Sequence, residues 1–158
     1  MRQRFFALAA CLLASTACRG SASIKSQLTV ELVSTGWRDG GAAAGRNKIV
    51  PSAAVKILNV SGRTLPSVQL NAVFHRLGEG GAWGTAFATA AGSSGLTPGG
   101  AATVTLNSER GYTGEDEQNA LLTNSQFVDA TVDVFAKYGS EQWTRVGEYP
   151  IDRQLLKP

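Results

Sequence analysis

The chain has 158 residues, which suffices for one ordinary domain with a short extension but not for two domains. Apolar residues make up 43% of it, so it can bury a core without disulfides and is not expected to be disordered. The net charge of +3 falls to +1 when Arg2 and Arg4 leave with an N-terminal leader, because 13 of the 15 Lys and Arg then face 12 Asp and Glu. No basic block remains, and nucleic-acid binding is not expected.

The N-terminus has the pattern of a secretory leader. Residues 1–4 (MRQR) carry positive charge, and residues 5–14 (FFALAACLLA) form an uncharged apolar run. A helix of ten residues spans about 15 Å, roughly half of a bilayer's hydrocarbon core. A stable transmembrane helix is therefore not expected, and residues 1–17 are predicted to be a signal peptide.

The leader ends in small residues, Ala14-Ser15-Thr16-Ala17, followed by Cys18. This segment resembles the lipobox of bacterial lipoproteins, in which small residues precede an obligatory cysteine at the cleavage point. The resemblance implies that Cys18 is acylated and becomes the first residue of the mature protein. Ser15 stands where the family usually has Leu, and cleavage by an ordinary signal peptidase after Ala17 would instead give a secreted protein.

The cysteine count favours acylation over ordinary secretion. Cys11 lies in the discarded leader, so Cys18 is the sole cysteine of the mature chain. A lone exposed thiol is a liability in an oxidising compartment, and acylation accounts for its presence. A diacylglyceryl group plus an N-acyl chain gives a firm anchor. By the family's sorting rule Asp after the cysteine retains the protein at the inner membrane; because Arg19 stands there, the resemblance implies the outer membrane, facing the periplasm.

Residues 18–26 are small and polar after the cysteine and are predicted to be a lipidated tether, with a β-sandwich domain over residues 27–158. Leu28–Leu32 alternates apolar and polar side chains and is predicted to be the first strand. A Gly- and Ala-rich loop is expected over Gly36–Lys48, and a second strand over Ala53–Val60.

The clearest alternation lies in Val68–Leu77, where Leu70 and Phe74 share one face and His75 lies on the other. In Gln126–Tyr138 a second alternation places Val128, Ala130, Val132 and Val134 on the inward face. Further strands are predicted over Trp83–Thr89, Ala102–Leu106 and Gln142–Ile151, and a short helix over Gly114–Asn124 with Glu115, Asp116 and Glu117 near its start.

These elements predict an all-β fold: an antiparallel immunoglobulin-like sandwich of about seven strands, with one short helix in a loop. A barrel is the main alternative. The order of an Asn-x-Ser-Gly turn at Asn59–Gly62, a strand ending in Phe74, a Gly turn, and Leu-x-Pro-Gly at Leu96–Gly99 resembles the FxLYD-type immunoglobulin-like domains of bacterial lipoproteins. The resemblance covers Lys56–Leu106, with His75 where the family often has Asp. It implies a sandwich without known catalytic residues.

Catalysis and metal binding are not expected. His75 is the only histidine, no Gly-x-Ser-x-Gly elbow supplies a nucleophile, and the mature domain lacks the His and Cys of the usual zinc sites. The acids around Glu115 and the pair Asp129 and Asp133 lack the spacing of a calcium loop. No cofactor is predicted.

Three tryptophans are the remaining candidates for binding. Trp83 and Trp143 lie in strand-like segments, where packing between the sheets is the commoner outcome. Trp37 lies in the predicted Gly-rich loop beside Arg38, and these two residues are the candidate contacts for a partner, with packing of Trp37 as the competing interpretation.

The sequence therefore predicts a membrane-anchored envelope lipoprotein that acts as a non-catalytic structural or protein-binding module, through a strand edge or a loop surface. The alternative is a module that binds a glycan or another cell-wall ligand. An exposed aromatic pair flanking a groove would favour that alternative, and buried tryptophans would count against it.

Overall fold

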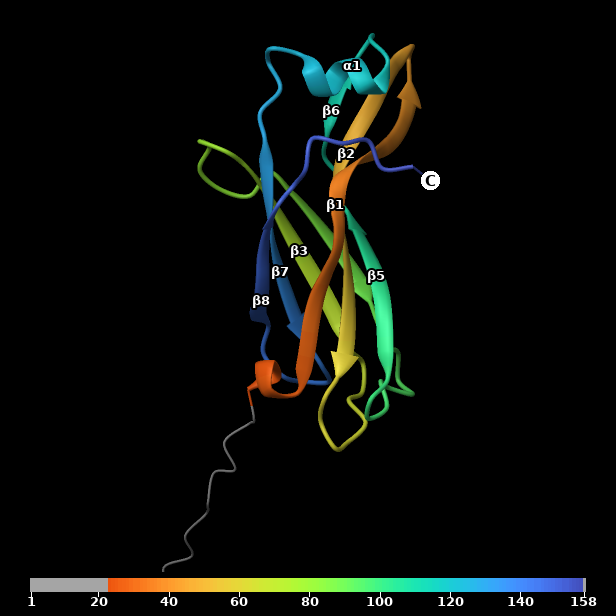
Figure 1. The fold of residues 1–158 in the computed structure, drawn as a ribbon, viewed down its shortest axis with the longest axis vertical. Coiled ribbons are helices and arrows are strands. Elements are labelled where there is room, and N and C mark those ends of the chain that lie inside the picture. Colours follow the sequence, from red (N-terminus) through yellow and green to blue (C-terminus); the bar gives the residue numbers. More distant parts are fainter. Residues whose placement is uncertain (1–22, 158) are drawn as a thin grey trace, which may run out of the picture.

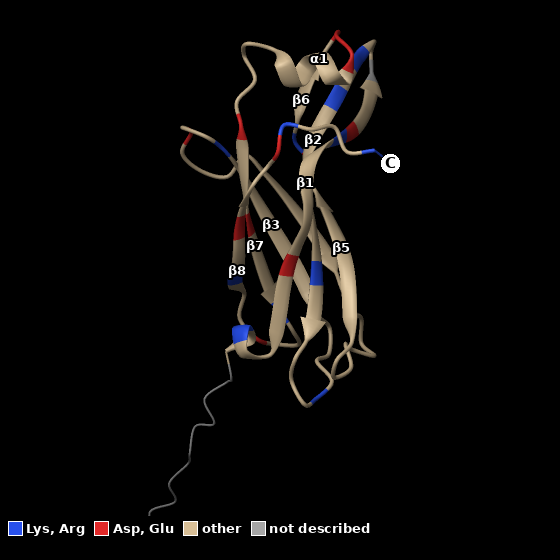
Figure 2. Ribbon diagram, in the orientation of Figure 1, with Lys and Arg blue, Asp and Glu red and all other residues tan. Residues whose placement is uncertain are grey.

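A computed structural model describes residues 23–157 as two antiparallel β-sheets packed face to face (Figure 1). The all-β prediction is confirmed, and the architecture is a sandwich with eight strands and one short α-helix in the described part of the chain. The predicted signal peptide 1–17 and the acylated Cys18 lie outside the described residues. Basic and acidic side chains are interspersed along the molecule (Figure 2).

The first sheet is built around β2 (Arg46–Asn59), which pairs with β1 (Leu28–Ala43) on one side. On its other side β2 pairs with β5 (Ala101–Asn107) and, further up, with the short strand β6 (Tyr112–Gly114). Pro51 lies in β2 at the gap between these two partners. Because proline has no backbone N–H to donate, an interior strand tolerates it only where the ladder is interrupted.

The second sheet has the order β4-β3-β7-β8. Its strands are β3 (Gln69–Arg76), β4 (Gly84–Thr89), β7 (Ala130–Lys137) and β8 (Thr144–Pro150). The chain changes sheet after β2, after β4 and after β6, and this crossing pattern is immunoglobulin-like. β4 pairs with β3, as an additional strand does in variable-type immunoglobulin domains.

The core follows the predicted alternation in the second sheet. In β3 Leu70 and Phe74 are buried while His75 lies on the outer face. In β7 the side chains of Ala130, Val132, Val134 and Ala136 are buried. Val128 was also expected to face inward, but it precedes the strand and remains partly exposed, because sheet pairing begins only at Ala130.

The prediction of a loop over Gly36–Lys48 is wrong. β1 continues to Ala43, and a tight turn at Ala44 and Gly45 returns the chain into β2. Both turn residues have positive φ, at 51° and 76°, a backbone conformation that glycine adopts without steric cost. The Gly- and Ala-rich composition hid these strands, because small residues give no alternation of apolar and polar side chains.

Two further boundaries differ from the prediction. Residues Ile24–Ser26, expected in the tether, form a 3-10 helix (η1), and Ile24 is buried in the core. The helix expected over Gly114–Asn124 is shorter, α1 (Gln118–Thr123). Gly114 belongs to β6, where a Cβ atom would lie 2.4 Å from Leu121 Cδ2, so any larger residue here requires the Leu121 side chain to shift.

Asn59 joins the two turns that gave the sequence its most distinctive motifs. Its fully buried side chain donates hydrogen bonds to the Leu96 carbonyl at 2.7 Å and to the Arg63 carbonyl at 2.8 Å, and accepts one from the Ser61 amide at 2.9 Å. Its backbone carbonyl accepts a hydrogen bond from the Gly99 amide at 2.9 Å. One amide side chain therefore satisfies several backbone groups in the turn after β2 and in the segment before β5.

We expect Asn59→Ala to lower the free energy of unfolding by about 2–4 kcal/mol, because its fully buried side chain makes several hydrogen bonds to backbone groups and all of them are lost together. Chemical denaturation measures this loss. Asn47→Ala is the matched control, since Asn47 makes one exposed hydrogen bond, to the Asp116 carbonyl. Equal losses for the two variants would contradict the assigned role of Asn59.

Candidate functional site

Trp37 lies in β1 and its side chain has no exposed surface. It packs at the centre of an aromatic cluster, with ring centroids 4.8 Å from Phe127, 5.6 Å from Tyr112 and 6.2 Å from Trp83. The ring is a core side chain, so the predicted contact between Trp37 and a partner is wrong for this side chain. Its position in a strand that faces the second sheet explains the burial.

The backbone of Trp37 also holds the C-terminal segment. The Trp37 amide donates a hydrogen bond to the Gln154 carbonyl at 2.8 Å, and the Leu156 amide donates one to the Trp37 carbonyl at 2.7 Å. These two hydrogen bonds form a parallel β-bridge between Trp37 and Leu155, on the outer edge of β1. Gly36 permits the close approach, because a Cβ atom there would lie 2.8 Å from Leu156 Cγ.

An ion pair fixes the start of this C-terminal segment. The Arg153 guanidinium donates hydrogen bonds to both carboxylate oxygens of Asp129, at 2.5 and 3.1 Å, and lies 4.8 Å from the centroid of the Phe127 ring. These hydrogen bonds to Asp129 raise the pKa of Arg153 above its ordinary value. Asp129, considered above as a calcium ligand, is thus engaged by a cation of the chain itself.

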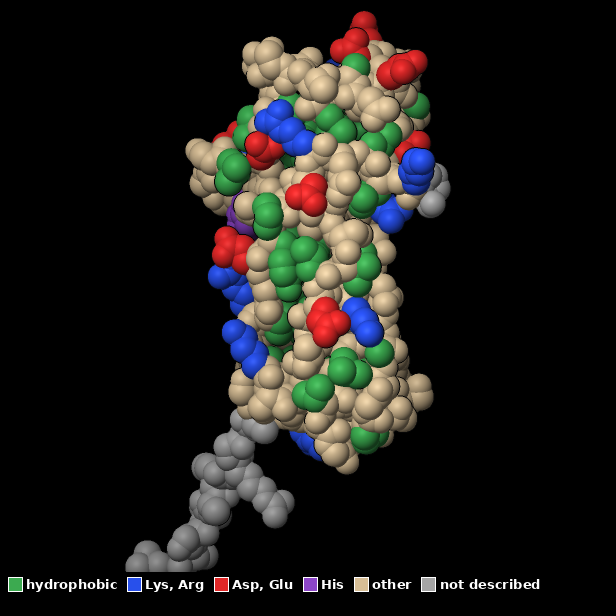
Figure 3. Space-filling view, viewed as in Figure 1, with side chains coloured by type: hydrophobic (Ala, Val, Ile, Leu, Met, Phe, Trp, Pro, Cys, Tyr) green, Lys and Arg blue, Asp and Glu red, His purple; other side chains and the backbone are tan. Residues whose placement is uncertain are grey.

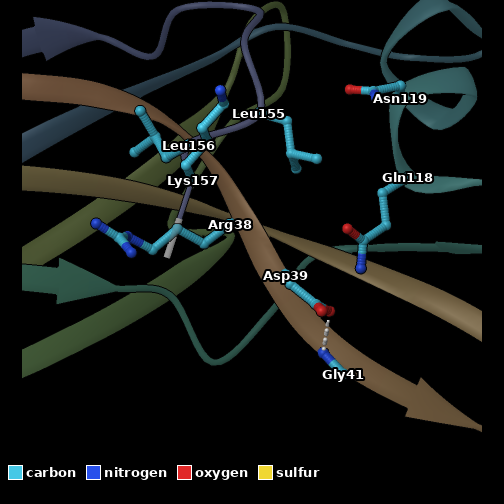
Figure 4. A pocket seen from close by; sticks show the side chains of 8 residues that line it. All are labelled: Arg38, Asp39, Gly41, Gln118, Asn119, Leu155, Leu156 and Lys157. Carbon is cyan, nitrogen blue, oxygen red and sulfur yellow. Dashed lines mark hydrogen bonds between the residues drawn. The ribbon is translucent and has the colours of Figure 1, made fainter.

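The C-terminal segment, β1 and α1 together line an open pocket of about 600 Å³ (Figure 4). Arg38, Leu156 and Lys157 lie at one end of its lining, and Gln118 lies at the other (Figure 4). The Asp39 carboxylate accepts a hydrogen bond from the Gly41 amide at 2.7 Å. The full lining consists of Arg38, Asp39, Gly41, Gln118, Asn119, Leu155, Leu156 and Lys157.

This lining combines two cations, one carboxylate, two amides and two leucines, and it contains no aromatic ring. Such a surface offers hydrogen-bond donors and acceptors beside an apolar area that exceeds the polar one, which suits a segment of a partner with both polar and apolar groups. Arg38, predicted from the sequence as a partner contact, lies in it. Gln118, Asn119 and the C-terminal residues were not predicted, because no local pattern reports that the chain end returns to β1.

His75 does not form a catalytic triad in the described part of the chain. Its Nδ1 lies 2.9 Å from the Gly81 carbonyl, and its Nε2 lies 3.5 Å from the Asp133 carboxylate. Asp133 also pairs with Arg145, whose pKa is raised by its hydrogen bonds to Asp133 and Glu148. Among residues 23–157, no serine, threonine or cysteine side chain is hydrogen-bonded to the His75 ring.

Among residues 23–157, no group of three or more His, Cys, Asp or Glu side chains is arranged so that it could hold a metal ion. None of the helices described for this chain has the length and apolar character needed to cross a membrane.

The other two tryptophans have different environments. Trp83 precedes β4 and is partly buried in the cluster around Trp37. Trp143 precedes β8 and lies on the outer face of the second sheet, 39% exposed and 6.3 Å from the Phe87 ring. Packing of Trp143 between the sheets, expected from its strand-like segment, is wrong, because its indole lies over the outer side of β7, 5.1 Å from Lys137 Nζ.

The free edge of β1 is a weaker candidate surface. Hydrophobic side chains gather along the seam between β8 and β1 (Figure 3), and β1 exposes Leu32 and Val33. A register shift between Leu32 and Ser34 interrupts the strand at this point. Such bulges hinder the addition of another strand, so the pocket is the better candidate.

No protein-family model matches this chain, and no curated protein or solved structure matches it either. The candidate site therefore stands on its own geometry.

Replacing Trp37 and Trp143 by alanine tests whether the first lies in the core and the second on the surface. We expect Trp37→Ala to lower the free energy of unfolding by about 3–5 kcal/mol, because it leaves a cavity inside the aromatic cluster. Trp143→Ala is expected to cost about 1 kcal/mol or less, since its ring is already partly in water. Denaturation of both variants measures the difference; a similar loss at both positions would contradict the burial of Trp37.

Proposed function

We propose that this chain is an exported lipoprotein, anchored to a membrane through Cys18, whose β-sandwich is a non-catalytic module that binds a protein partner. The binding site of this module is the pocket between β1, α1 and the C-terminal segment. We place the protein in the cell envelope, at the outer membrane on its periplasmic side, as the lipobox resemblance implies.

The observation that carries this proposal is the placement of the two ends of the sandwich. The chain enters the domain at η1, and α1 and the pocket lie at the opposite end of the long axis (Figure 1). The chain between Cys18 and Ile24 can span at most about 20 Å. An anchor at Cys18 therefore keeps the η1 end near the bilayer and directs the pocket away from it, where a partner can reach it.

The chemistry of the lining favours a protein over a glycan. Sugar sites commonly use an exposed aromatic ring as a stacking surface, and the lining has none. The pocket instead adjoins the edge of β1 to which Gln154 and Leu156 already bind as an extended segment. An extended segment of a partner can use the same kinds of contact, with Arg38 and Lys157 available to pair with its carboxylates or carbonyls.

The titratable groups of the pocket support a binding role over catalysis. They are Arg38, Asp39 and Lys157, and no nucleophile lies beside a base among them. The Asp39 carboxylate accepts its hydrogen bond from a backbone amide, which positions it in the strand.

Membrane fractionation tests the anchor. The wild-type protein is expected in the membrane fraction, with an N-terminal peptide that begins at Cys18 and carries the mass of its acyl chains. Cys18→Ala is expected to move to the soluble fraction, because the anchor is lost while the folded domain is unchanged. A soluble wild-type protein with an unmodified Cys18 would contradict the proposal.

Affinity capture from solubilised envelopes tests the pocket. Arg38→Glu reverses the charge of one lining side chain, and we expect it to reduce recovery of the partner by about tenfold or more. Arg110→Glu makes the same charge change at an exposed position outside this pocket and should recover the partner as wild type does.

Equal recovery by Arg38→Glu and wild type would remove the pocket as the binding site. Retention of wild type, but not of Arg38→Glu, on isolated cell-wall polymer with no protein captured would transfer the site to the glycan alternative.

A further inference from the structure

The outer face of the second sheet exposes a large aromatic pair. Phe87 of β4 is 61% exposed and Trp143 is 39% exposed, and their rings meet edge to face with centroids 6.3 Å apart. Phe87 therefore remains mostly in contact with solvent, and Trp143 remains partly so. Contiguous exposed apolar surface is uncommon on soluble proteins and often marks an interaction site.

The strand register places further side chains beside the pair. Phe87 is opposite Asn71 of β3, which is opposite Phe135 of β7, and all three side chains lie on the same outer face. Lys137 lies two residues after Phe135 in β7, and its Nζ is 5.1 Å from the centroid of the Trp143 ring. We call Phe87, Phe135, Lys137 and Trp143 the aromatic face.

The aromatic face lies near the end at which the chain enters the domain. Tyr138, the residue after Lys137, accepts a hydrogen bond through its hydroxyl from Gln27 Nε2 at 2.8 Å. Arg63 donates to the same hydroxyl at 3.0 Å and to Gln27 Oε1 at 2.8 Å. This network fixes the end of β7, and with it Lys137 and Trp143, against the residue that follows η1.

The physical chemistry of this face suits a lipid headgroup layer. Tryptophan and phenylalanine side chains partition into the interface between water and hydrocarbon, and a neighbouring lysine pairs with anionic headgroups. A lipid anchor at Cys18 would hold the face within reach of the bilayer at a high effective concentration, so a weak surface suffices for contact.

We propose that the aromatic face rests on the membrane beside the anchor and sets the tilt of the domain. The inference rests on the proposed function, because the anchor is what brings the domain to the bilayer. The charges of the sheet agree with this orientation. Asp133 and Glu148, which lie further along the strands from the entry end, both pair with Arg145. Lys137 favours anionic lipid, but the carboxylate of Glu141 in the turn between β7 and β8 offsets part of its charge, so we expect only a modest preference.

The test uses the mature chain, residues 18–158, coupled through Cys18 to a maleimide lipid. Because Cys18 is its sole cysteine, this coupling reproduces an anchor at the native position whether or not cells acylate it. The vesicles contain phosphatidylcholine with about one quarter phosphatidylglycerol, with and without bromine atoms near the headgroups. The measurement is quenching of tryptophan fluorescence by the brominated lipid.

We expect brominated lipid to quench the wild-type protein, and Trp143→Phe to lose most of this quenching, since Trp37 is buried and Trp83 is partly buried. Phe87→Ser should reduce quenching about twofold or more, because it removes half of the exposed pair. Leu77→Ser is the matched control: Leu77 is 55% exposed, but it lies in the turn after β3, at the other end of that strand from Gln69.

Quenching that is absent in wild type, or that persists in Trp143→Phe, would overturn the proposal. So would protection of Trp143 from a soluble quencher by cell-wall saccharides and not by vesicles, which would assign the face to a glycan. Circular dichroism spectra establish that each variant is folded. If the cellular protein carries no lipid but the coupled protein is quenched, the proposed anchor fails while the membrane affinity of the face stands.

Discussion

The rest of this molecule depends on the burial of Trp37. Its ring fills the core where β1 and β2 extend toward β6, and its backbone holds the C-terminal segment on the edge of β1. Without that ring, the long hairpin would lose its aromatic contacts with Phe127 and Tyr112. The wall formed by Leu155–Lys157 is held on β1 by the amide and carbonyl of this core residue, together with the ion pair between Arg153 and Asp129. The residue that fills the core therefore also helps to form the pocket wall.

The sandwich separates its chemistry along its length. At the η1 end, Gln27, Arg63 and Tyr138 tie the start of the domain to the end of β7, and exposed aromatic rings lie nearby. At the other end, polar and charged groups surround a pocket whose walls come from three separate parts of the chain. A lipid anchor at Cys18 would turn this asymmetry into an orientation, with apolar surface toward the bilayer and hydrogen-bonding surface toward a partner.

The second sheet could be predicted in more detail than the first, in which only Leu28–Leu32, Ala53–Val60 and the strand β5 could be predicted. In β3 and β7, one face is buried and the other meets solvent, so the burial of Leu70 and Val132 can be derived from alternation alone. The part of β1 after Ser34 lacks this contrast because glycine and alanine fill many of its positions. In β2 the contrast is absent over Ile49–Val55, because these residues are buried as a continuous run. A composition that resembles a loop then conceals a hairpin, and the boundary error placed Trp37 on the surface.

The amino-acid sequence by itself determined the class of fold, the turns at Asn59 and before β5, and the expectation of an exported chain with a lipid on Cys18. These follow from local patterns: period-two hydrophobicity, turn residues and a short apolar leader. Only the tertiary structure decided which tryptophan is buried and which is exposed, and that Arg38 meets Gln118 and the chain end around one pocket. The reason is physical: side-chain burial and pocket walls depend on contacts between segments far apart in the chain, which local periodicity does not encode.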